Sequence, residues 1–154
     1  MSAAGSLRIL VVEARFYEDI AEALFAGARA ELEAHGARFD RISVPGAFEI
    51  PAVIAMAERA ATAGRGPRYD GYIALGCVIR GETTHYDYVA GESARGLMDL
   101  AVREGLAIGY GILTTENRDQ AWVRADPAQK NKGADAARAC LQQIANRRRL
   151  EAWA

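Results

Sequence analysis

The sequence predicts an α/β fold, in which a mostly parallel sheet is covered by helices on both faces. Short β-branched runs alternate along the 154 residues with longer segments whose apolar side chains recur at helical spacing. Strands that alternate with helices are joined by right-handed crossovers, so neighbouring strands are parallel. Because 51% of the residues are hydrophobic, we expect one domain with one buried core over residues 1–154.

The first half of the chain predicts two strand–helix units. Leu7–Val12 (LRILVV) is typical of a strand buried in a parallel sheet, and Glu18–Ala34 has the spacing of a helix with one apolar face. Phe39–Val44 predicts a second strand, which ends at the turn Pro45-Gly46. A second helix is expected over Phe48–Ala63.

The middle of the chain predicts a third unit. Tyr69–Leu75 (YDGYIAL) resembles a strand. The stretch Gly76–His85 is rich in glycine and polar residues, which favours an extended loop. Tyr86–Glu104 then returns to helical spacing, so the loop is expected to open onto a helix.

The last third predicts a strand followed by two helices. Ala107–Leu113 has strand character, although Gly109 and Gly111 are unfavourable inside a strand. Arg118–Arg124 is expected to form a short helix and Gly133–Arg147 a longer one. The element order is therefore β-α-β-α-β-α-β-α-α.

Composition excludes several classes of partner and site. The 19 Lys and Arg residues nearly balance the 20 Asp and Glu residues, so no basic field is present to hold nucleic acid or an anionic membrane. Apolar stretches are only as long as strands, and no basic segment leads into an apolar one at the N-terminus; we expect a cytoplasmic protein. Cys77 and Cys140 belong to no C-x-x-C pair, so neither a disulfide framework nor a metal site is predicted.

Ligands of open α/β sheets bind beyond the carboxyl ends of the strands. The loops to inspect are therefore Ala14–Tyr17, Val44–Glu49, Gly76–His85 and Thr114–Asn117. Their residue types favour a site for a planar, anionic or proton-exchanging ligand.

The first two loops carry an aromatic ring and a carboxylate. Phe16 is suited either to stacking on a planar heterocycle or to packing against the start of the following helix. Glu49 stands near a helix start, where it either accepts a hydrogen bond from a ligand ring N–H or complements the helix dipole. The sequence leaves both pairs of alternatives open.

The third loop, GCVIRGETTH, is the most informative. Glycine, two hydroxyls and free backbone amides ahead of a helix are typical of a phosphate cradle. The alternative is that Thr83 or Thr84 simply caps the helix. His85 ends the loop, and an imidazole, with an ordinary pKa of about 6.5, exchanges protons near neutral pH.

Positive charge gathers near the start of the last predicted helix. Arg124, Lys130 and Lys132 lie within nine residues of one another. This cluster either binds a phosphate or is solvated surface.

Five segments resemble, in order and spacing, the lumazine synthase family over nearly the whole chain. They are RF at 15–16, VPGAFEIP at 44–51, GCVIRGETTHYDYV at 76–89, GILTTEN at 111–117 and NKG at 131–133. The second and third of these segments together are highly specific, whereas RF or NKG alone means little.

The resemblance implies a flavodoxin-like three-layer sandwich around a four-stranded parallel sheet with helices on both faces. It also implies a homo-oligomer built on pentamers, with active sites between subunits. The implied reaction, part of riboflavin biosynthesis, condenses 5-amino-6-(D-ribitylamino)uracil with 3,4-dihydroxy-2-butanone 4-phosphate to 6,7-dimethyl-8-ribityllumazine, phosphate and water. No redox change occurs in it, so no cofactor is expected.

The resemblance also assigns roles to residues of one subunit. Those implied to bind the ribitylaminouracil are Phe16, which stacks on the pyrimidine, and Ala47, Phe48, Glu49, Cys77, Val78 and Ile79. Glu82 and Thr83 are implied to hold the butanone phosphate. His85 is implied to be catalytic, as the group that transfers protons.

An adjacent subunit is implied to complete the site. It would bring Tyr110 near the pyrimidine, Arg124 to the phosphate and Lys132 to the same pocket. Two departures from the family pattern stand out. Tyr17 occupies a position where many relatives have Asn, and residues 126–130 replace the glycine-rich turn typical of shell-forming members, which favours a smaller pentamer-based assembly.

Two competing interpretations remain. In the first, Cys77 is a nucleophile and His85 is its base, since both lie in one predicted loop. In the second, the chain is a flavin- or lumazine-binding paralogue that has kept the pocket but has little catalysis.

Overall fold

The structure, a computed structural model, describes residues 5–153. Its four strands are all parallel and lie in the order β2-β1-β3-β4. The strands are Arg8–Ala14 (β1), Arg38–Val44 (β2), Gly71–Ile79 (β3) and Ile108–Thr115 (β4). The helices are Glu18–Ala34 (α1), a short 3₁₀ helix at Ala47–Glu49 (η1), Ile50–Thr62 (α2), His85–Glu104 (α3), Arg118–Ala125 (α4) and Lys132–Glu151 (α5).

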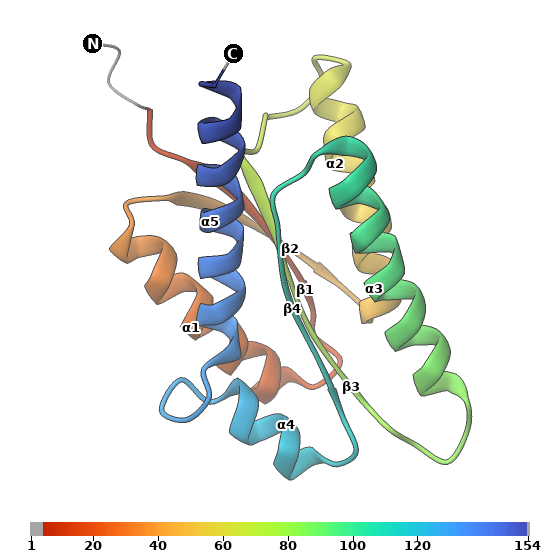
Figure 1. The fold of residues 1–154 in the computed structure, drawn as a ribbon. Helices are drawn as coiled ribbons and strands as arrows, with labels where there is room; N and C mark the ends of the chain where they lie inside the picture. Colours follow the sequence, from red (N-terminus) through yellow and green to blue (C-terminus); the bar gives the residue numbers. More distant parts are fainter. Residues whose placement is uncertain (1–4, 154) are drawn as a thin grey trace.

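Helices cover both faces of this sheet. Figure 1 shows α1, α4 and α5 on one face and α2 and α3 on the other. The strand order matches the first four strands of the flavodoxin arrangement. The predicted flavodoxin-like α/β sandwich is therefore confirmed.

Side chains of β1 alternate between two separate cores. Ile9 and Val11 pack with α1, α4 and α5, whereas Leu10 and Val12 pack with α2 and α3. All four side chains are fully buried. Since a parallel sheet is covered on both faces, its strands are apolar on both faces, which explains the unbroken run LRILVV.

Strand β3 is longer than the sequence predicted, and the prediction of a loop throughout Gly76–His85 is wrong. β3 continues to Ile79, which is paired with Thr115 of β4, and α3 begins at His85. Only residues 80–84 form the loop. Gly76 and the polar residues after it resemble a loop locally, but β3 is a central strand, and its ladder with β4 decides the outcome. The end of β3 therefore reaches the ligand-binding edge.

The two glycines that weakened the prediction of β4 have a packing role. A Cβ at Gly109 would lie 1.9 Å from the carbonyl oxygen of Ala136 in α5. Gly133, at the start of α5, comes equally close to α1, because a Cβ there would lie 1.9 Å from the carbonyl oxygen of Leu24. Helix α5 thus rests directly on the backbones of β4 and α1, and this contact fixes where its first turn lies.

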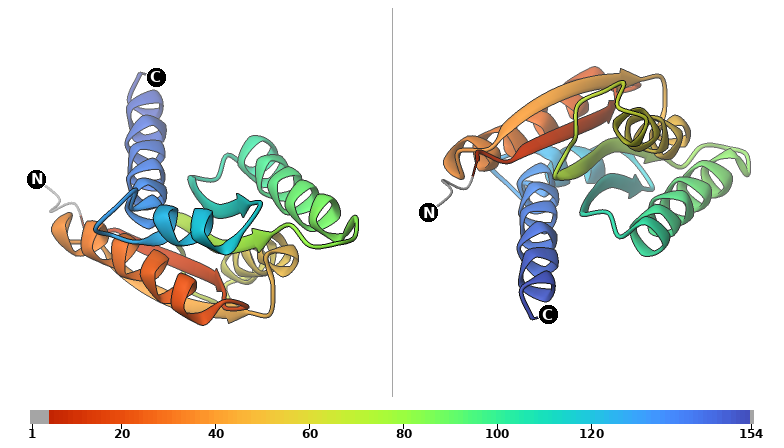
Figure 2. Two further views of the ribbon diagram at one scale, coloured as in Figure 1. Left: turned by 90° about the horizontal axis from the view of Figure 1, so that it is seen from below. Right: turned by 90° about the horizontal axis from the view of Figure 1, so that it is seen from above.

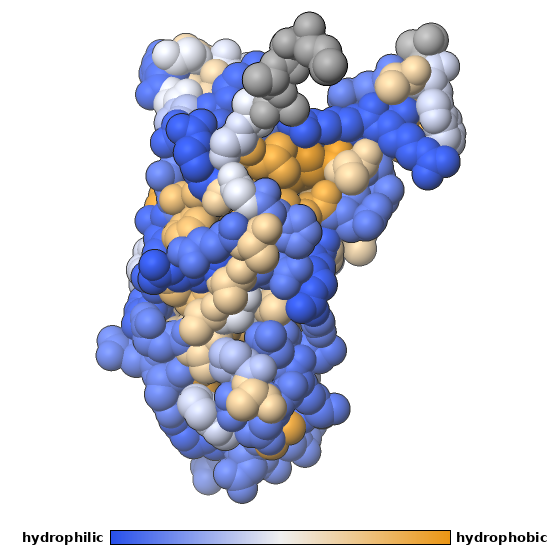
Figure 3. All heavy atoms as spheres, turned by 90° about the vertical axis from the view of Figure 1, so that its left-hand side faces the viewer, coloured by the Kyte–Doolittle hydropathy of each residue, from blue (hydrophilic) through white to orange (hydrophobic). Residues whose placement is uncertain are grey.

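The far end of α5 is placed differently. Both views of Figure 2 show the C-terminal half of α5 extending beyond the rest of the molecule. Figure 3, which views the side of α1, shows a mainly hydrophilic surface, with the largest group of hydrophobic residues in its upper part. Among residues 5–153, no helix combines the length and the apolar character needed to cross a membrane.

Candidate active site

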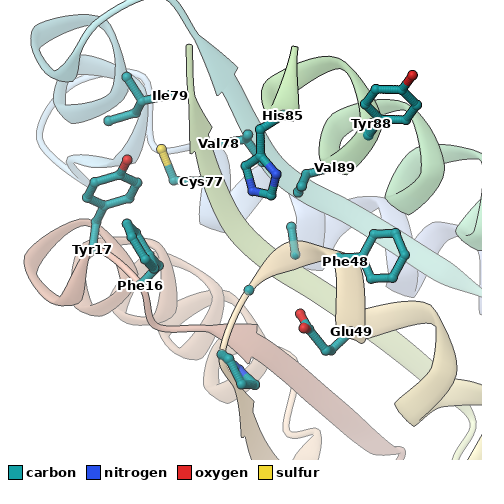
Figure 4. Close-up of a pocket in the computed structure, with 13 residues that line it drawn as sticks. Phe16, Tyr17, Phe48, Glu49, Cys77, Val78, Ile79, His85, Tyr88 and Val89 are labelled. Atoms are coloured by element: carbon teal, nitrogen blue, oxygen red, sulfur yellow. The ribbon is translucent and has the colours of Figure 1, made fainter. Parts of the chain in front are cut away.

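Segments at the carboxyl edge of the sheet surround a cavity of about 580 Å³, here called the carboxyl-edge cavity. They are the segments after β1 and β2, the last residues of β3 and the first turn of α3, which parallel topology brings to one edge. Figure 4 shows side chains from all of these segments around this space. The candidate residues among its lining are Phe16, Ala47, Phe48, Glu49, Cys77, Val78, Ile79 and His85.

The loop after β1 presents the ring of Phe16. This side chain is 72% exposed, so it does not pack down onto the first turn of α1 as a helix-entry contact would require. Its ring meets that of Tyr17 edge to face, with the centroids 4.9 Å apart. The arrangement leaves the ring available to stack on a planar ligand.

The segment after β2 forms a second wall. Ala47 is buried in the core, whereas Phe48 is 57% exposed and lines the cavity. The Glu49 carboxylate also lines it and has no hydrogen-bond partner within residues 5–153. It is therefore placed to accept a hydrogen bond from a ligand N–H.

The end of β3 forms the floor of the cavity, through Cys77, Val78 and Ile79. Burial raises the pKa of the Cys77 thiol to about 11, although Arg118 and Thr115 act in the opposite direction. A thiol with this pKa is protonated at neutral pH and is a poor nucleophile. The interpretation of Cys77 as a nucleophile activated by His85 therefore lacks support.

His85 is the first residue of α3, and Figure 4 shows its ring over the cavity, beside Val78 and Val89. Neither ring nitrogen has a hydrogen-bond partner in the part of the chain that the structure describes. Its backbone N–H donates to Oγ1 of Thr83 at 3.4 Å. The imidazole is thus held at the cavity with both nitrogens available to a substrate.

The loop at residues 80–84 leads into α3 but does not line the carboxyl-edge cavity. Glu82 and Thr83 are exposed beside it, and the N-cap residue Thr84 makes no side-chain capping hydrogen bond. The first N–H groups of a helix have no partner within the helix, so this position suits an anion. Thr84 therefore does not cap α3, whereas Oγ1 of Thr83 accepts the N–H of its first residue, His85, so the capping alternative holds for Thr83 only.

Arg80 holds this loop, a role that the sequence did not reveal. Its backbone N–H donates to the carbonyl oxygen of Thr115 at 2.9 Å, and its guanidinium pairs with Glu116 at 2.9 Å. The same guanidinium lies 4.2 Å from the centroid of the Tyr86 ring. These contacts tie the loop to the end of β4 and to the first turn of α3.

Tyr110, Arg124 and Lys132 lie elsewhere, in a cavity of about 410 Å³ formed by β4, α4 and α5. We call it the β4 cavity. It shares no lining residue with the carboxyl-edge cavity. One chain therefore does not bring these three residues to Phe16 and His85.

The β4 cavity is cationic, but its charges have partners. Arg124 donates to the carbonyl oxygen of Gln120 at 3.0 Å, and Nζ of Lys132 lies 3.1 Å from Asp135. Burial raises the pKa of Tyr110, so its hydroxyl is neutral at pH 7. Strand β4 is an edge of the sheet, which leaves this region open to another molecule.

The sequence did not single out several lining residues of the carboxyl-edge cavity. Tyr88 and Val89 follow His85 by three and four residues on α3, so helical spacing was a signal that could have found them. Tyr17, which the sequence had marked only as a departure from the family pattern, adjoins Phe16. Within residues 5–153, no group of three or more His, Cys, Asp or Glu side chains is arranged to hold a metal ion.

Comparison with known proteins accounts for this combination of fold and site. The model of the 6,7-dimethyl-8-ribityllumazine synthase family matches residues 6–148. A protein named 6,7-dimethyl-8-ribityllumazine synthase 1, from Rhizobium meliloti (strain 1021), is 58% identical over 146 residues, which cover 95% of each chain. Two proteins named 6,7-dimethyl-8-ribityllumazine synthase are each 57% identical to this chain. The one from Agrobacterium fabrum matches over 92% of this chain and 95% of its own length. The one from Methylorubrum populi matches over 96% of this chain and 86% of its own length. The chain therefore belongs to the 6,7-dimethyl-8-ribityllumazine synthase family.

Proposed function

We propose that this chain is an enzyme of riboflavin biosynthesis that condenses 5-amino-6-(D-ribitylamino)uracil with 3,4-dihydroxy-2-butanone 4-phosphate. The products are 6,7-dimethyl-8-ribityllumazine, phosphate and water. Membership of the family supports this reaction. The observation that carries it is the meeting of an exposed ring, Phe16, and an unpaired imidazole, His85, at one cavity.

The carboxyl-edge cavity is the proposed site of the ribitylaminouracil. Phe16 stacks on the pyrimidine, and Glu49 accepts from a ring N–H. The remaining contacts come from Ala47, Phe48, Cys77, Val78 and Ile79. A volume of about 580 Å³ is within the range of small-molecule sites.

The loop at residues 80–84 is the proposed site of the butanone phosphate, through Glu82 and Thr83. The N-terminus of the 20-residue helix α3 supports this assignment, because the positive end of a helix dipole favours an anion. Arg124 of an adjacent subunit is the proposed cationic partner of the phosphate.

We propose that the chain acts as a homopentamer or a small multiple of it, with each active site between two subunits. The β4 cavity of one copy would bring Tyr110, Arg124 and Lys132 to the carboxyl-edge cavity of the next. The separation of the two cavities in one chain, and the open edge at β4, support this arrangement. We also propose a single domain and a cytoplasmic location.

In the proposed mechanism, the 5-amino group attacks the ketone of the butanone phosphate and forms an imine with loss of water. Loss of phosphate then gives an enol, and the ribitylamino nitrogen closes the second ring with loss of a second water. Each stage moves a proton, and His85 is the proposed group that moves it. Because the steps need only proton transfer and proximity, we propose no cofactor.

The test is a two-substrate assay that follows lumazine fluorescence, with light scattering on the same sample. The proposed enzyme forms fluorescent product only when both substrates are present. Tight flavin binding without product formation would support the alternative, a flavin- or lumazine-binding paralogue. If the protein neither formed product nor bound flavin, the assignment of the carboxyl-edge cavity to the ribitylaminouracil would be overturned.

A further inference from the structure

Tyr17 is one of the aromatic residues that line the carboxyl-edge cavity, and the proposed mechanism gives it no role. Its ring lies 4.9 Å from that of Phe16, at an interplanar angle of 80°. Edge-to-face pairs of this kind are attractive beyond the area that they bury. Figure 4 shows the two rings next to each other on one wall of the cavity.

The backbone of this loop is held by the residue before Phe16. The N–H of Arg15 donates to the carbonyl oxygen of Val44 at 3.3 Å. Its guanidinium pairs with the fully buried Glu13 and, at 2.6 Å, with Glu22. These contacts fix the main chain but leave the torsions of the exposed Phe16 side chain free.

An exposed side chain changes rotamer on the picosecond to nanosecond timescale. If a side chain becomes ordered only when the ligand binds, this ordering reduces the free energy of binding. Phe16 is 72% exposed, so its side chain needs a neighbour to restrict it before the ligand binds. Tyr17 is the aromatic ring that contacts it within residues 5–153.

Tyr17 is itself anchored. It is half-buried against the core beneath α1, α4 and α5, and burial raises the pKa of its hydroxyl. The hydroxyl makes no hydrogen bond within the described residues, and the neighbouring guanidinium of Arg118 is paired with Asp19. The ring, rather than the hydroxyl, is therefore the part of Tyr17 in a position to act on Phe16.

We infer that Tyr17 is a positioning residue for ligand recognition, which holds the Phe16 ring in the orientation that stacks on the pyrimidine. The inference rests on the proposed function, since the pyrimidine comes from the proposed substrate. Tyr17 acts on affinity for the ring-containing substrate and product. It does not act on the phosphate or on proton transfer.

The experiment titrates the lumazine product into wild-type protein and two variants and follows fluorescence. Tyr17→Leu is expected to raise the Kd about twofold to tenfold, because the aromatic pair is lost. The KM for the ribitylaminouracil rises by the same factor, while kcat and the KM for the butanone phosphate stay unchanged. Tyr17→Phe keeps wild-type values, because it retains the ring.

A matched control removes a tyrosine ring at the opposite end of the sheet. Tyr69 is also half-buried and precedes β3, with its hydroxyl donating to Asp40 at 2.8 Å. Tyr69→Leu is expected to leave the Kd for the product unchanged. An equal rise in Tyr69→Leu would mean that general loosening of the fold causes the effect, which would overturn the inference.

A double-mutant cycle tests whether Tyr17 acts through Phe16. In a Phe16→Leu background, Tyr17→Leu is expected to have no further effect on Kd. Additive losses, wild-type affinity in Tyr17→Leu, or equal damage by Tyr17→Phe would each overturn the inference. If Tyr17→Leu does not fold, Tyr17→Met, which fills space without a ring, takes its place with the same expected results.

The two possible failures are distinguishable. Wild-type protein that neither binds lumazine nor forms it overturns the proposed function and the inference with it. Normal wild-type binding with unaffected Tyr17 variants overturns the inference alone.

Discussion

In the proposed reaction, the carboxyl-edge cavity and the β4 cavity carry different parts of one chemistry. The first holds a stacking ring, Phe16, and a proton-exchanging group, His85. The second holds the cations Arg124 and Lys132. No residue lines both, and we therefore propose that the β4 cavity of a neighbouring copy completes the site. Sharing of each site between two subunits would explain why the site is incomplete in one chain.

The two cavities also differ in how their polar groups are satisfied. The His85 ring and the Glu49 carboxylate have no hydrogen-bond partner in residues 5–153, so they are ready to bind a ligand. Lys132 is instead paired with Asp135, three residues along α5. Such exposed pairs contribute only about 0.2–0.5 kcal/mol, so a phosphate can replace the partner at little cost.

The largest expected effect is on the proton-transfer group of the carboxyl-edge cavity. His85→Ala is expected to lower kcat at least about 100-fold, the usual contribution of general acid–base catalysis, while oligomer size stays the same. Steady-state lumazine fluorescence and light scattering measure the two quantities. The matched control is His35→Ala, because His35 ends α1 and bonds to the carbonyl oxygen of Glu31. Wild-type turnover in His85→Ala would remove its catalytic role.

A second prediction concerns the floor of the same cavity. The pKa of Cys77 is raised to about 11 from an ordinary 9.0, so the protonated thiol is favoured up to about pH 11. Alkylation by iodoacetamide at pH 7 is therefore expected to be about 100-fold slower than for an ordinary thiol, and to accelerate about tenfold per pH unit. Mass spectrometry of a Cys140→Ser variant isolates the reaction at Cys77. Fast alkylation at pH 7 would instead revive Cys77 as a nucleophile.

The sequence predicted the contents of the carboxyl-edge cavity better than its shape. Parallel topology places the loops after β1, β2 and β3 together, so Phe16, Glu49 and His85 were expected at one edge. The extension of β3 to Ile79 was missed, because strand pairing with β4 outweighs local residue preference.

For the β4 cavity the sequence was less informative. Arg124 and Lys132 were recognised as a local cluster of charge, and their separation from the other site was implied by the family resemblance alone, since no periodicity indicates it. That separation depends on α5 resting on the backbone at Gly109 and Gly133. Close backbone approach is a tertiary property, and a glycine in a strand sequence does not say which element will approach it.

The next prediction tests the β4 cavity directly. Arg124→Ala is expected to raise the KM for the butanone phosphate about tenfold to a hundredfold, the value of one charge-assisted contact. The KM for the ribitylaminouracil is expected to stay the same. Arg149→Ala is the matched control, because Arg149 lies near the end of α5, over Trp153, and lines neither cavity. Unchanged affinity in Arg124→Ala would reject the phosphate assignment.

The smallest departure from the wild-type rate is expected when His85→Ala and Arg124→Ala subunits are mixed. This experiment is also the sharpest test of whether the two cavities of one site come from different chains. In an oligomer formed from equal amounts of His85→Ala and Arg124→Ala subunits, some interfaces join an intact carboxyl-edge cavity to an intact β4 cavity. With random assembly, each of the two cavities that form a site is intact with a probability of one half. About a quarter of the sites are therefore fully intact, and about a quarter of the wild-type rate is expected. The rate is measured at subsaturating butanone phosphate, where both parent variants are slow. If both cavities of a site belonged to one chain, every site would carry one defect, and mixing would give only the average of the two parents.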